Sequence, residues 1–332
     1  MAEPRLTRGL REKGRFPVDE LRTNELSEYL TRIANEACMS KGRCVTVRVM
    51  SNSNVRTPSA GDSSEEISFR VKSILAFQRV AGADVIIFGM YVHEYGEVGA
   101  PLYAGRVFVE CVDSPPVLPD TPGAERQAVL TAVLHGYMKS ASSRGFRFLH
   151  LHVPPPEDGS KYIFLPRTLA IRLQATVHLS CWFERVLKAS KAGGLISGFK
   201  SSWAGDEEEV SMASRHSTES EDEEGALLVK GVGSTSWQSR HGYFNERFFM
   251  ATLMPPRILR DKDIPLMPSR VVGRRADLSR LIAVEKLRFK SLEQAHGACL
   301  AVIRSVTLEQ RNPQLHPRPA GGGGGGGKFW GI

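Results

Sequence analysis

The order of strand-like and helix-like segments constrains the fold of this chain more than any other feature of its sequence. Four runs rich in β-branched and aromatic residues, separated by Gly, Ala and Asp, occupy 44–50, 71–80, 83–92 and 106–112. Helical patterns then cover 126–142 and 171–189, with one more strand-like run at 146–153 between them. This alternation predicts an α/β fold, in which a central mixed β-sheet of a single domain is flanked by helices.

The remaining apolar patterns add further elements at both ends of this core. Apolar residues at helical spacing predict helices at 23–37 and 277–288, and the apolar run at 245–253 predicts a strand. The residues SLEQ at 291–294 have the form of a capping box, which predicts the start of a last helix.

Composition separates the ordered domain from segments of different character. We expect a basic flexible arm over 1–20, a domain over 21–310, and a Pro- and Gly-rich tail over 311–332, where seven consecutive glycines cannot pack. Within the domain, 190–238 is expected to be a disordered acidic insertion, because its stretch 206–224 holds nine acidic residues. The arm either serves nuclear import or nucleic-acid contact or is merely solvated, and the acidic stretch either attracts a basic tail or only adds solubility.

The overall balance of residues indicates a folded, basic chain. Of the 332 residues, 41% are hydrophobic, and the net charge of +8 favours polyanions such as nucleic acid, phosphates or a nucleotide cofactor. The five cysteines form no CxxC pair, so neither a zinc module nor a disulfide framework is predicted, and a reducing compartment fits best. No apolar run reaches the roughly 18 residues of a membrane helix, so we expect a soluble, intracellular chain with no membrane partner.

The motifs of several common enzyme classes are absent from the sequence. There is no GxxxxGK[ST] loop, no GxGxxG after a strand, no GxSxG elbow and no HExxH. Asp113 and Ser114 invite comparison with a Ser-His-Asp hydrolase, but nothing places the serine on a strained turn. His150 and His152 alternate on one face of a strand without a third ligand at recognisable spacing, so we expect core or pocket-lining histidines and no metal site.

Several separated motifs, in order and at compatible spacing, carry a resemblance to a known family. The clearest is FGMYVHEYG at 88–96. The others are RVKSILAFQRVAGADV at 70–85, VDS at 112–114, Arg126 to Val129 with Gly136-Tyr137, Tyr162 to Phe164, Trp182-Phe183, RFFMATL at 247–253, IPLMP at 264–268 and LRFKSLEQA at 287–295. Together they resemble the catalytic domain of the CREB-binding-protein family of histone acetyltransferases, including its plant members. The resemblance spans about 20 to 306 and implies an acetyltransferase-like core.

The resemblance implies a role for each matched residue, with acetyl-CoA as the cofactor. The implied cofactor-binding residues are Val112, Asp113, Ser114, Arg126 and Gln127. The guanidinium of Arg126, at a helix start, suits the phosphate oxygens. Tyr162 would flank the tunnel for the substrate lysine. Trp182 would pack on the pantetheine or the tunnel wall, although ordinary packing of a helix face explains this residue as well.

The implied catalytic residues include two departures from the family pattern. Phe183 stands where the family has a tyrosine that protonates the leaving thiolate, and loss of a general acid costs about 10² to 10⁴ in rate. His152 replaces a family tryptophan, and either its imidazole supplies the missing proton or the change is a simple loss or a neutral packing change. In the substrate region Val71 replaces a threonine, and Asp277 is the only acid in 273–279.

Two functions follow from the resemblance and its departures. In the first, the chain is an acetyl-CoA-dependent histone or protein lysine acetyltransferase that acts in transcription and chromatin regulation in the nucleus. Its partners would be histone tails or other lysine-rich proteins and transcription factors or chromatin complexes, without direct sequence-specific binding to nucleic acid. In the second, it is a catalytically impaired relative that keeps acetyl-CoA binding or a scaffolding role.

Overall fold

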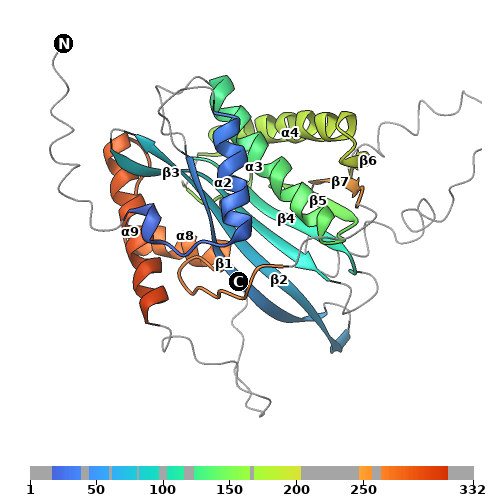
Figure 1. Cartoon of the computed structure of the whole chain (residues 1–332), viewed down its shortest axis with the longest axis horizontal. Coiled ribbons are helices and arrows are strands. Elements are labelled where there is room, and N and C mark those ends of the chain that lie inside the picture. The colour runs from blue at the N-terminus through green and yellow to red at the C-terminus, as the bar shows by residue number, and fades with distance from the viewer. Residues whose placement is uncertain are drawn as a thin grey trace, which may run out of the picture.

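A mixed β-sheet forms the centre of the computed structural model, which describes residues 17–38, 45–59, 62–80, 82–96, 103–115, 123–164, 168–202, 247–255 and 263–312 (Figure 1). In spatial order its seven strands in this part of the chain are β1 (Val45–Ser59), β2 (Asp62–Val80), β3 (Ala83–Tyr95), β4 (Arg106–Asp113), β5 (Phe148–Val153), β7 (Arg247–Leu253) and β6 (Ile196–Ser201). All neighbours pair antiparallel except β4 and β5, which are parallel. The predicted mixed sheet is therefore confirmed.

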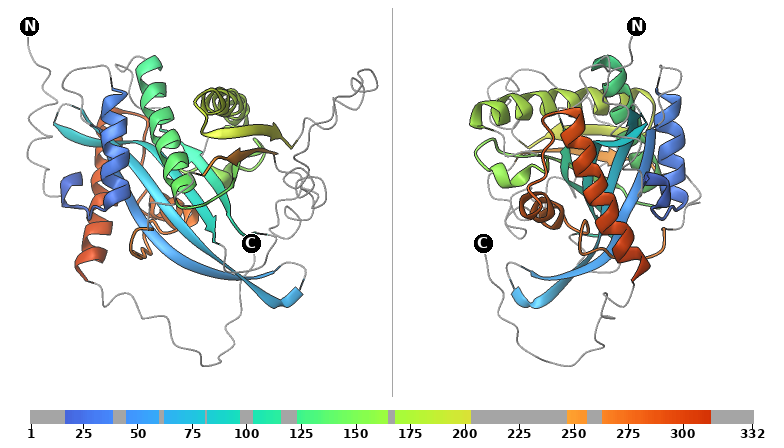
Figure 2. Two further views of the ribbon diagram at one scale, coloured as in Figure 1. Left: turned by 45° about the vertical axis from the view of Figure 1, so that its right-hand side comes forward. Right: turned by 90° about the vertical axis from the view of Figure 1, so that its left-hand side faces the viewer.

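Helices cover both faces of this sheet and confirm the predicted α/β class. One face is covered by α2 (Glu25–Glu36), α3 (Gly123–Ser143) and α4 (Leu169–Ala192), and the other by α8 (Arg275–Val284) and α9 (Leu292–Arg311). Figure 2 shows α2 and α9 on opposite sides of the strands. Two short 3-10 turns, η1 (Val18–Glu20) and η2 (Gly159–Lys161), complete the described elements.

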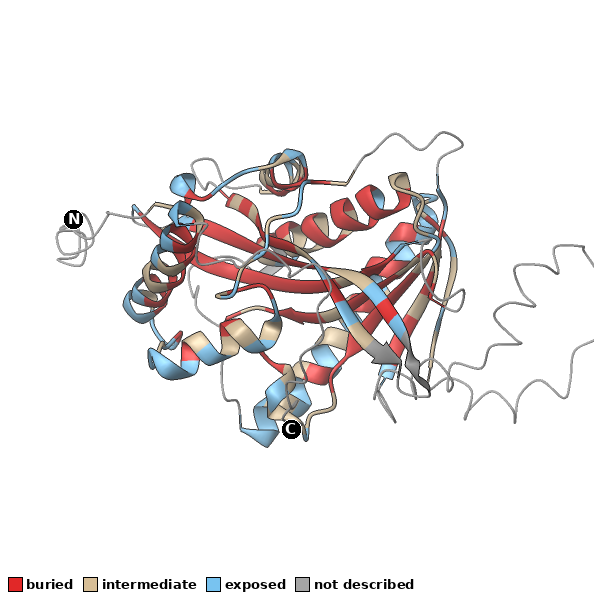
Figure 3. Cartoon of the chain, turned by 90° about the horizontal axis from the view of Figure 1, so that it is seen from below, coloured by how far each residue is buried: buried red, intermediate tan, exposed pale blue. Residues whose placement is uncertain are grey.

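Each face of the sheet has its own apolar core. Leu30 of α2, Leu134 of α3 and Leu187 of α4 pack with Val47 and Val109 on one side. On the other side, residues of α9 pack with apolar residues of β2 and β3; these include Val302, Val306, Leu75, Phe77 and Ile86. Figure 3 shows the strands buried along most of their length between these layers. Burial on both faces makes the sheet a rigid support for residues at the strand ends.

Local signals explain where the helices begin. Asn24 accepts a hydrogen bond from the N–H of Ser27 at 2.9 Å and caps α2. Ser291 accepts one from the N–H of Gln294 at 3.2 Å, which confirms the helix start predicted from SLEQ. Gly136 lets α2 approach α3 closely, because a Cβ there would lie 1.9 Å from Cδ1 of Ile33.

The strands at the start of the sheet are longer than predicted. We expected strands at 44–50 and 71–80, whereas β1 runs to Ser59 and β2 begins at Asp62. The additional part of β1 is polar, which hid it from a search for apolar runs, yet Asn52 is buried. Its side-chain amide donates to the carbonyl of Ile264 at 2.9 Å, so a distant segment supplies the partner that the apolar pattern does not.

Two segment boundaries predicted from composition, the start of the insertion and the end of the basic arm, fall within the described residues and were wrong. The insertion expected from residue 190 cannot begin there, because α4 continues to Ala192 and β6 pairs with β7. The basic arm expected over 1–20 ends earlier, because Val18 is buried and its N–H donates to Asp84 at 3.0 Å. The remainder of the arm, the acidic stretch 206–224 and the tail from 313 lie outside the described residues.

Candidate functional site

A pocket of about 380 Å³ lies between the end of β4, the first turns of α3 and the middle of α4. Its lining residues are Phe88, Val112, Asp113, Ser114, Arg126, Gln127, Leu130, Tyr162, Ala175, His178, Leu179 and Trp182. The fold thus brings together all five residues predicted to bind the cofactor and two of the four predicted catalytic residues. This volume lies in the range of pockets that hold small molecules.

The pocket opens where two parallel strands stop pairing. The register of β4 and β5 ends with Val109 opposite Leu151, although each strand continues beyond that pair. The carbonyl of Glu110, next along β4, accepts a hydrogen bond from Nδ1 of His152 at 2.8 Å instead. Because the ladder ends there, the last residues of β4 turn away from β5 and line the pocket.

Asp113 holds one wall of the pocket in place. Its Oδ2 atom accepts hydrogen bonds from the backbone N–H groups of Ile163 at 2.9 Å and Phe164 at 3.1 Å. Its Oδ1 atom accepts from the N–H of Ser114 at 2.8 Å. These bonds fasten the segment that carries Tyr162 to the end of β4, so the carboxylate acts here as a structural anchor.

Arg126 and Ser114 form the polar edge of the pocket. The hydroxyl of Ser114 donates to the carbonyl of Ile87 at 2.6 Å and accepts from Nη2 of Arg126. Nη2 also donates to the carbonyl of Pro115. These contacts hold a half-buried guanidinium in the first turns of α3, near the positive end of the helix dipole. A phosphate group would be stabilised at such a place.

Tyr162 is fixed by its hydroxyl. The side chain is buried, and its oxygen lies 3.0 Å from Oγ1 of Thr176 on α4. The tyrosine hydroxyl also lies 3.5 Å from the carbonyl of Arg172, and the hydroxyl of Thr176 lies 3.2 Å from the carbonyl of Pro154. Tyr162 therefore ties the loop after β5 to α4 and presents its ring to the pocket.

Trp182 and Phe183 lie on different sides of α4. Trp182 lines the pocket and donates from Nε1 to Oγ1 of Thr131 at 2.9 Å. Phe183 is completely buried and meets Phe249 edge-on, with ring centroids 6.3 Å apart. Successive helical residues are turned by about 100°, so the residue after Trp182 faces the sheet. The structure places Phe183 in the core and outside the residues that line the pocket.

His152 also lies outside the pocket. It is completely buried on the sheet face opposite α4, with its ring 6.0 Å from that of Phe108 and 5.2 Å from that of Phe248. The carbonyl of Glu110 can only accept a hydrogen bond, so Nδ1 of this imidazole is the donor. Of the predicted catalytic residues, Tyr162 and Trp182 reach the pocket, and Phe183 and His152 do not.

His178 lines the pocket, and the sequence reasoning missed it. It lies on α4 one turn before Trp182, and its side chain is exposed. Ala175, His178, Leu179 and Trp182 follow the spacing of one helix face, which was the available signal.

The substrate region predicted at 273–279 faces the partly buried carboxylate of Glu110 on the other side of the sheet. Arg275 donates from Nε to Glu110 at 3.1 Å, and His93 lies 3.3 Å from the same carboxylate. Burial favours the neutral form of Glu110, but His93 and Arg275 outweigh it and lower its pKa to about 2. The other two residues predicted for the substrate region have structural places. The carboxylate of Asp277 accepts a hydrogen bond from the backbone N–H of Arg274 at 3.1 Å and caps α8. The side chain of Val71 is buried within β2.

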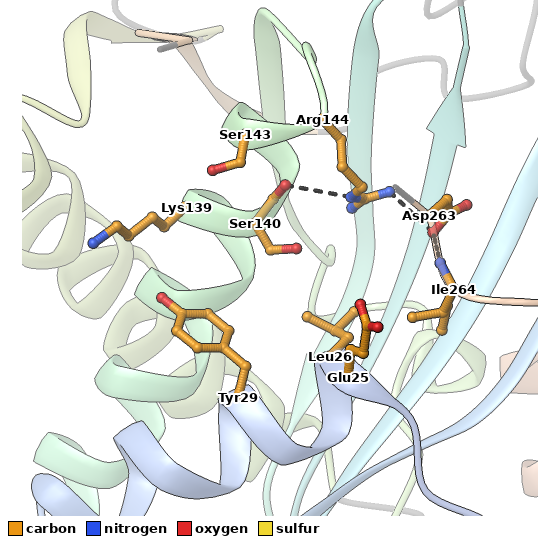
Figure 4. A pocket seen from close by; sticks show the side chains of 9 residues that line it. All are labelled: Glu25, Leu26, Tyr29, Lys139, Ser140, Ser143, Arg144, Asp263 and Ile264. Atoms are coloured by element: carbon orange, nitrogen blue, oxygen red, sulfur yellow. Dashed lines mark hydrogen bonds and ion pairs between the residues drawn. The ribbon is translucent and has the colours of Figure 1, made fainter. Parts of the chain in front are cut away.

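A second pocket, of about 320 Å³, lies between α2 and α3 (Figure 4). At its wall Arg144 donates to both carboxylate oxygens of Glu94 at 2.7 Å and lies 3.3 Å from Asp263. Lys72, completely buried, joins the same two carboxylates. Burial would raise the pKa of Glu94, but Lys72 and Arg144 hold it far below its usual range. This network anchors the segment at Asp263 to the sheet.

Neither metal ligands nor membrane helices mark the described residues. Their His, Cys, Asp and Glu side chains include no group of three or more placed to hold an ion. Within the same part of the chain, every helix is too short or too polar to cross a membrane.

Comparison with known proteins identifies the family. The sequence model of the histone acetyltransferase domain KAT3 matches residues 27–219, more than half of the chain. The chain belongs to the KAT3 histone acetyltransferase domain family. This membership confirms the resemblance to CREB-binding-protein enzymes. The similarity expected at 247–306 lies outside the matched residues and stays a prediction.

Curated KAT3 relatives come from animals and plants. Protein cbp-1 of Caenorhabditis elegans is 29% identical over 136 residues, which is 41% of this chain and 7% of the relative. The probable histone acetyltransferase HAC-like 2 of Oryza sativa subsp. japonica is 36% identical over 128 residues, 37% of this chain and 9% of the relative. The probable histone acetyltransferase HAC-like 3 of the same species is 26% identical over 218 residues, which is 58% of this chain and 17% of the relative. The chain therefore spans only a small part of these relatives.

Proposed function

We propose that this chain is an acetyl-CoA-dependent lysine acetyltransferase that acts on histone tails or other lysine-rich proteins in the nucleus. The observation that carries the proposal is the pocket at the end of β4. Residues far apart in the sequence, from Val112 to Trp182, line this one pocket, and they include the residues for which the resemblance implies contact with the cofactor. Association with transcription factors or chromatin complexes belongs to the same proposal.

The residues of the pocket fit the parts of acetyl-CoA. The guanidinium of Arg126, held against Ser114, offers charge-assisted hydrogen bonds to phosphate oxygens. Leu130, Leu179 and Trp182 offer an apolar wall for the pantetheine chain. The ring of Tyr162 provides a further apolar surface for the alkyl stem of a lysine. When bound, acetyl-CoA would supply the thioester from which the acetyl group passes to an amine.

The test is acetyl transfer from labelled acetyl-CoA to core histones by the 332-residue chain. Turnover that falls at least tenfold in Arg126→Ala would support the proposal, because the phosphate partner is lost. The control is Arg304→Ala, an exposed arginine of α9 on the opposite face of the sheet, which should keep native turnover. Native protein that neither binds acetyl-CoA nor labels histones would contradict it.

A second function is favoured by one observation, the place of Phe183. The phenyl ring has no proton to give and is buried outside the pocket. A relative that binds acetyl-CoA without transferring its acetyl group, and that acts as a scaffold, agrees with this arrangement. Calorimetric binding of acetyl-CoA without histone labelling would support this alternative and contradict the first.

A further inference from the structure

The first half of α4 carries a cluster of exposed apolar side chains. In the part of the chain that the structure describes, eight large apolar side chains are exposed, and four of them lie within nine residues of this helix. They are Leu169, Ile171, Leu173 and Val177, with exposed fractions from 48% to 60%. Single exposed apolar residues are ordinary on a protein surface, but a cluster of them marks a site of contact.

The body of the protein does not pack against this end of the helix. The first buried residue of α4 is Thr176, so the two turns before it contribute no buried side chain. A helix is normally held in place by burial of one apolar face, and turns without such a face are marginal on their own. The exposed apolar residues therefore lie where a partner could cover them and support these turns.

Three of the four side chains form a stripe along the helix. Leu169, Leu173 and Val177 follow one another at intervals of four residues, so they lie one turn apart on the same side of α4. None of the three lines the pocket at the end of β4. The stripe is therefore a separate surface, and what it binds does not depend on the proposed function.

The same side of α4 becomes basic in its second half. Lys188 and Lys191 follow Val177 by 11 and 14 residues, about three and four helical turns, and both are exposed. Glu184, which pairs with Lys188 at 2.6 Å, also lies in this half, beside the exposed Arg185. Three cations and one anion give this half of the helix a net charge of +2.

This division favours a partner helix over a membrane or a second copy of the chain. A helix that lies on an anionic membrane carries basic residues beside its apolar stripe, whereas in α4 the two follow each other along the axis. Four apolar side chains are also few compared with the roughly 20 to 30 residues that each partner contributes to a stable interface. The face from 169 to 191 is about 33 Å long, which suits one helix of about 20 residues.

We propose that the exposed face of α4 binds a partner protein through an amphipathic helix, which places apolar residues over Leu169, Leu173 and Val177 and acidic residues over Lys188 and Lys191. The apolar side chains of the partner would pack between turns of the stripe. Its carboxylates would complement the basic half. In an antiparallel arrangement the acidic residues come first in the partner helix, where its own dipole also favours them.

The probe is a fluorescently labelled synthetic peptide of about 20 residues, with glutamates in its first half and leucines at every third or fourth position of its second half. Fluorescence anisotropy should show saturable binding to the 332-residue chain. Leu173→Gln/Val177→Gln should weaken binding about tenfold or more, because apolar contact is lost. The matched control is Leu308→Gln, an exposed leucine of α9 on the opposite face of the sheet, which should keep native affinity.

A charge reversal tests the basic half of the face. Lys188→Glu/Lys191→Glu should weaken binding of the acidic peptide about 3- to 10-fold at low salt, and much less at about 0.5 M NaCl. A peptide with lysines in place of the glutamates should bind this double variant more tightly than it binds the native chain. The control is Arg288→Glu/Lys290→Glu, two exposed residues just before α9, which should behave like the native chain toward both peptides.

The remaining outcomes overturn the proposal. These are no saturable binding by the native chain, equal weakening by Leu308→Gln, or no reversal of peptide preference in Lys188→Glu/Lys191→Glu. Binding to vesicles of phosphatidylserine and phosphatidylcholine that is lost in Leu173→Gln/Val177→Gln would assign the stripe to a membrane instead. Self-association of the native chain in sedimentation that is lost in the same variant would assign it to a second copy. Circular dichroism of every variant excludes unfolding as the cause of a loss.

Discussion

Trp182 and Phe183 have ring centroids 5.4 Å apart, yet only Trp182 lines the pocket at the end of β4. The difference follows from the helix, which turns adjacent side chains to different sides. One side chain contacts whatever the pocket holds, and the other packs against Phe249 in the core. Of these two adjacent aromatic residues, Trp182 therefore belongs to the pocket lining and Phe183 to the core.

Phe183→Tyr should not increase acetyl transfer. The added hydroxyl would enter a completely buried, apolar environment and should lower the free energy of unfolding by about 1 to 3 kcal/mol. Chemical denaturation and histone labelling of the same preparation check both effects. A clear rise in turnover would show that position 183 reaches the reacting atoms and that the orientation of α4 differs from this account.

Asp113→Ala should destabilise the wall of the pocket. Removal of the carboxylate leaves the backbone N–H groups of Ile163 and Phe164 without their acceptor in a buried place, at a cost of about 2 to 4 kcal/mol. Urea denaturation measures this loss. The control is Glu157→Ala, an exposed residue of the same loop, which should change the free energy of unfolding by less than about 0.5 kcal/mol. Equal stability of the two variants would refute the anchoring role.

Glu110 should contribute to stability in a way that depends on pH. Its pKa falls from an ordinary 4.5 to about 2 in the folded chain, since His93 and Arg275 outweigh the effect of burial. A lowered folded pKa contributes stability above pH 4.5 that is lost as the pH falls from there toward 2, with a total of about 3 kcal/mol.

Glu110→Gln should therefore lower the free energy of unfolding at pH 7 and flatten its decline between pH 4.5 and 2. Denaturation at a series of pH values measures this dependence. The comparison variant is Glu36→Gln, whose carboxylate pairs with Arg32 on the exposed surface of α2 and should contribute little. Parallel curves for native protein and Glu110→Gln would count against a stabilising role of the ion pairs of Glu110 with His93 and Arg275.

Two glycines should respond to alanine in opposite directions. At Gly273, before α8, a Cβ would lie 2.0 Å from the backbone carbonyl oxygen of Ser269, so Gly273→Ala should lower the free energy of unfolding by about 1 to 3 kcal/mol. At Gly297, within α9, a Cβ would meet nothing within 4 Å, and Gly297→Ala should raise it by up to about 1 kcal/mol. Thermal denaturation of both variants checks the pair, and destabilisation by Gly297→Ala would be inconsistent with the open space described.

The sequence predicts the elements that carry runs or periodic sets of apolar residues. It places β3, β4, β5, α3 and α4 within a few residues of their observed bounds, because these strands are buried on both faces and read as nearly continuous apolar runs, and the helices bury one face against the sheet. The polar half of β1 escapes prediction because its buried Asn52 is satisfied by the backbone of Ile264, more than 200 residues away in the chain. No local pattern encodes such a long-range partner.

The candidate site, like the fold, was predictable only in part from the sequence. Seven of the residues that line the pocket were predicted from the family resemblance, but the roles of Asp113 and of the predicted catalytic residue His152 depend on contacts that the sequence does not display. Asp113 anchors a loop by backbone hydrogen bonds, and His152 lies on the opposite face of the sheet from the pocket. His178 was missed because a single exposed histidine on a helix is unremarkable until the fold places it in a pocket.

Calorimetric titration of acetyl-CoA into the native chain, Arg126→Ala and Arg304→Ala tests the central claim most directly, because it measures the pocket without requiring turnover. The native chain and Arg304→Ala should both bind acetyl-CoA saturably. Loss of the charge-assisted contact should weaken binding to Arg126→Ala by about 10- to 100-fold, equivalent to about 1.5 to 3 kcal/mol. Absence of native binding, or equal affinity of all three proteins, would contradict the account.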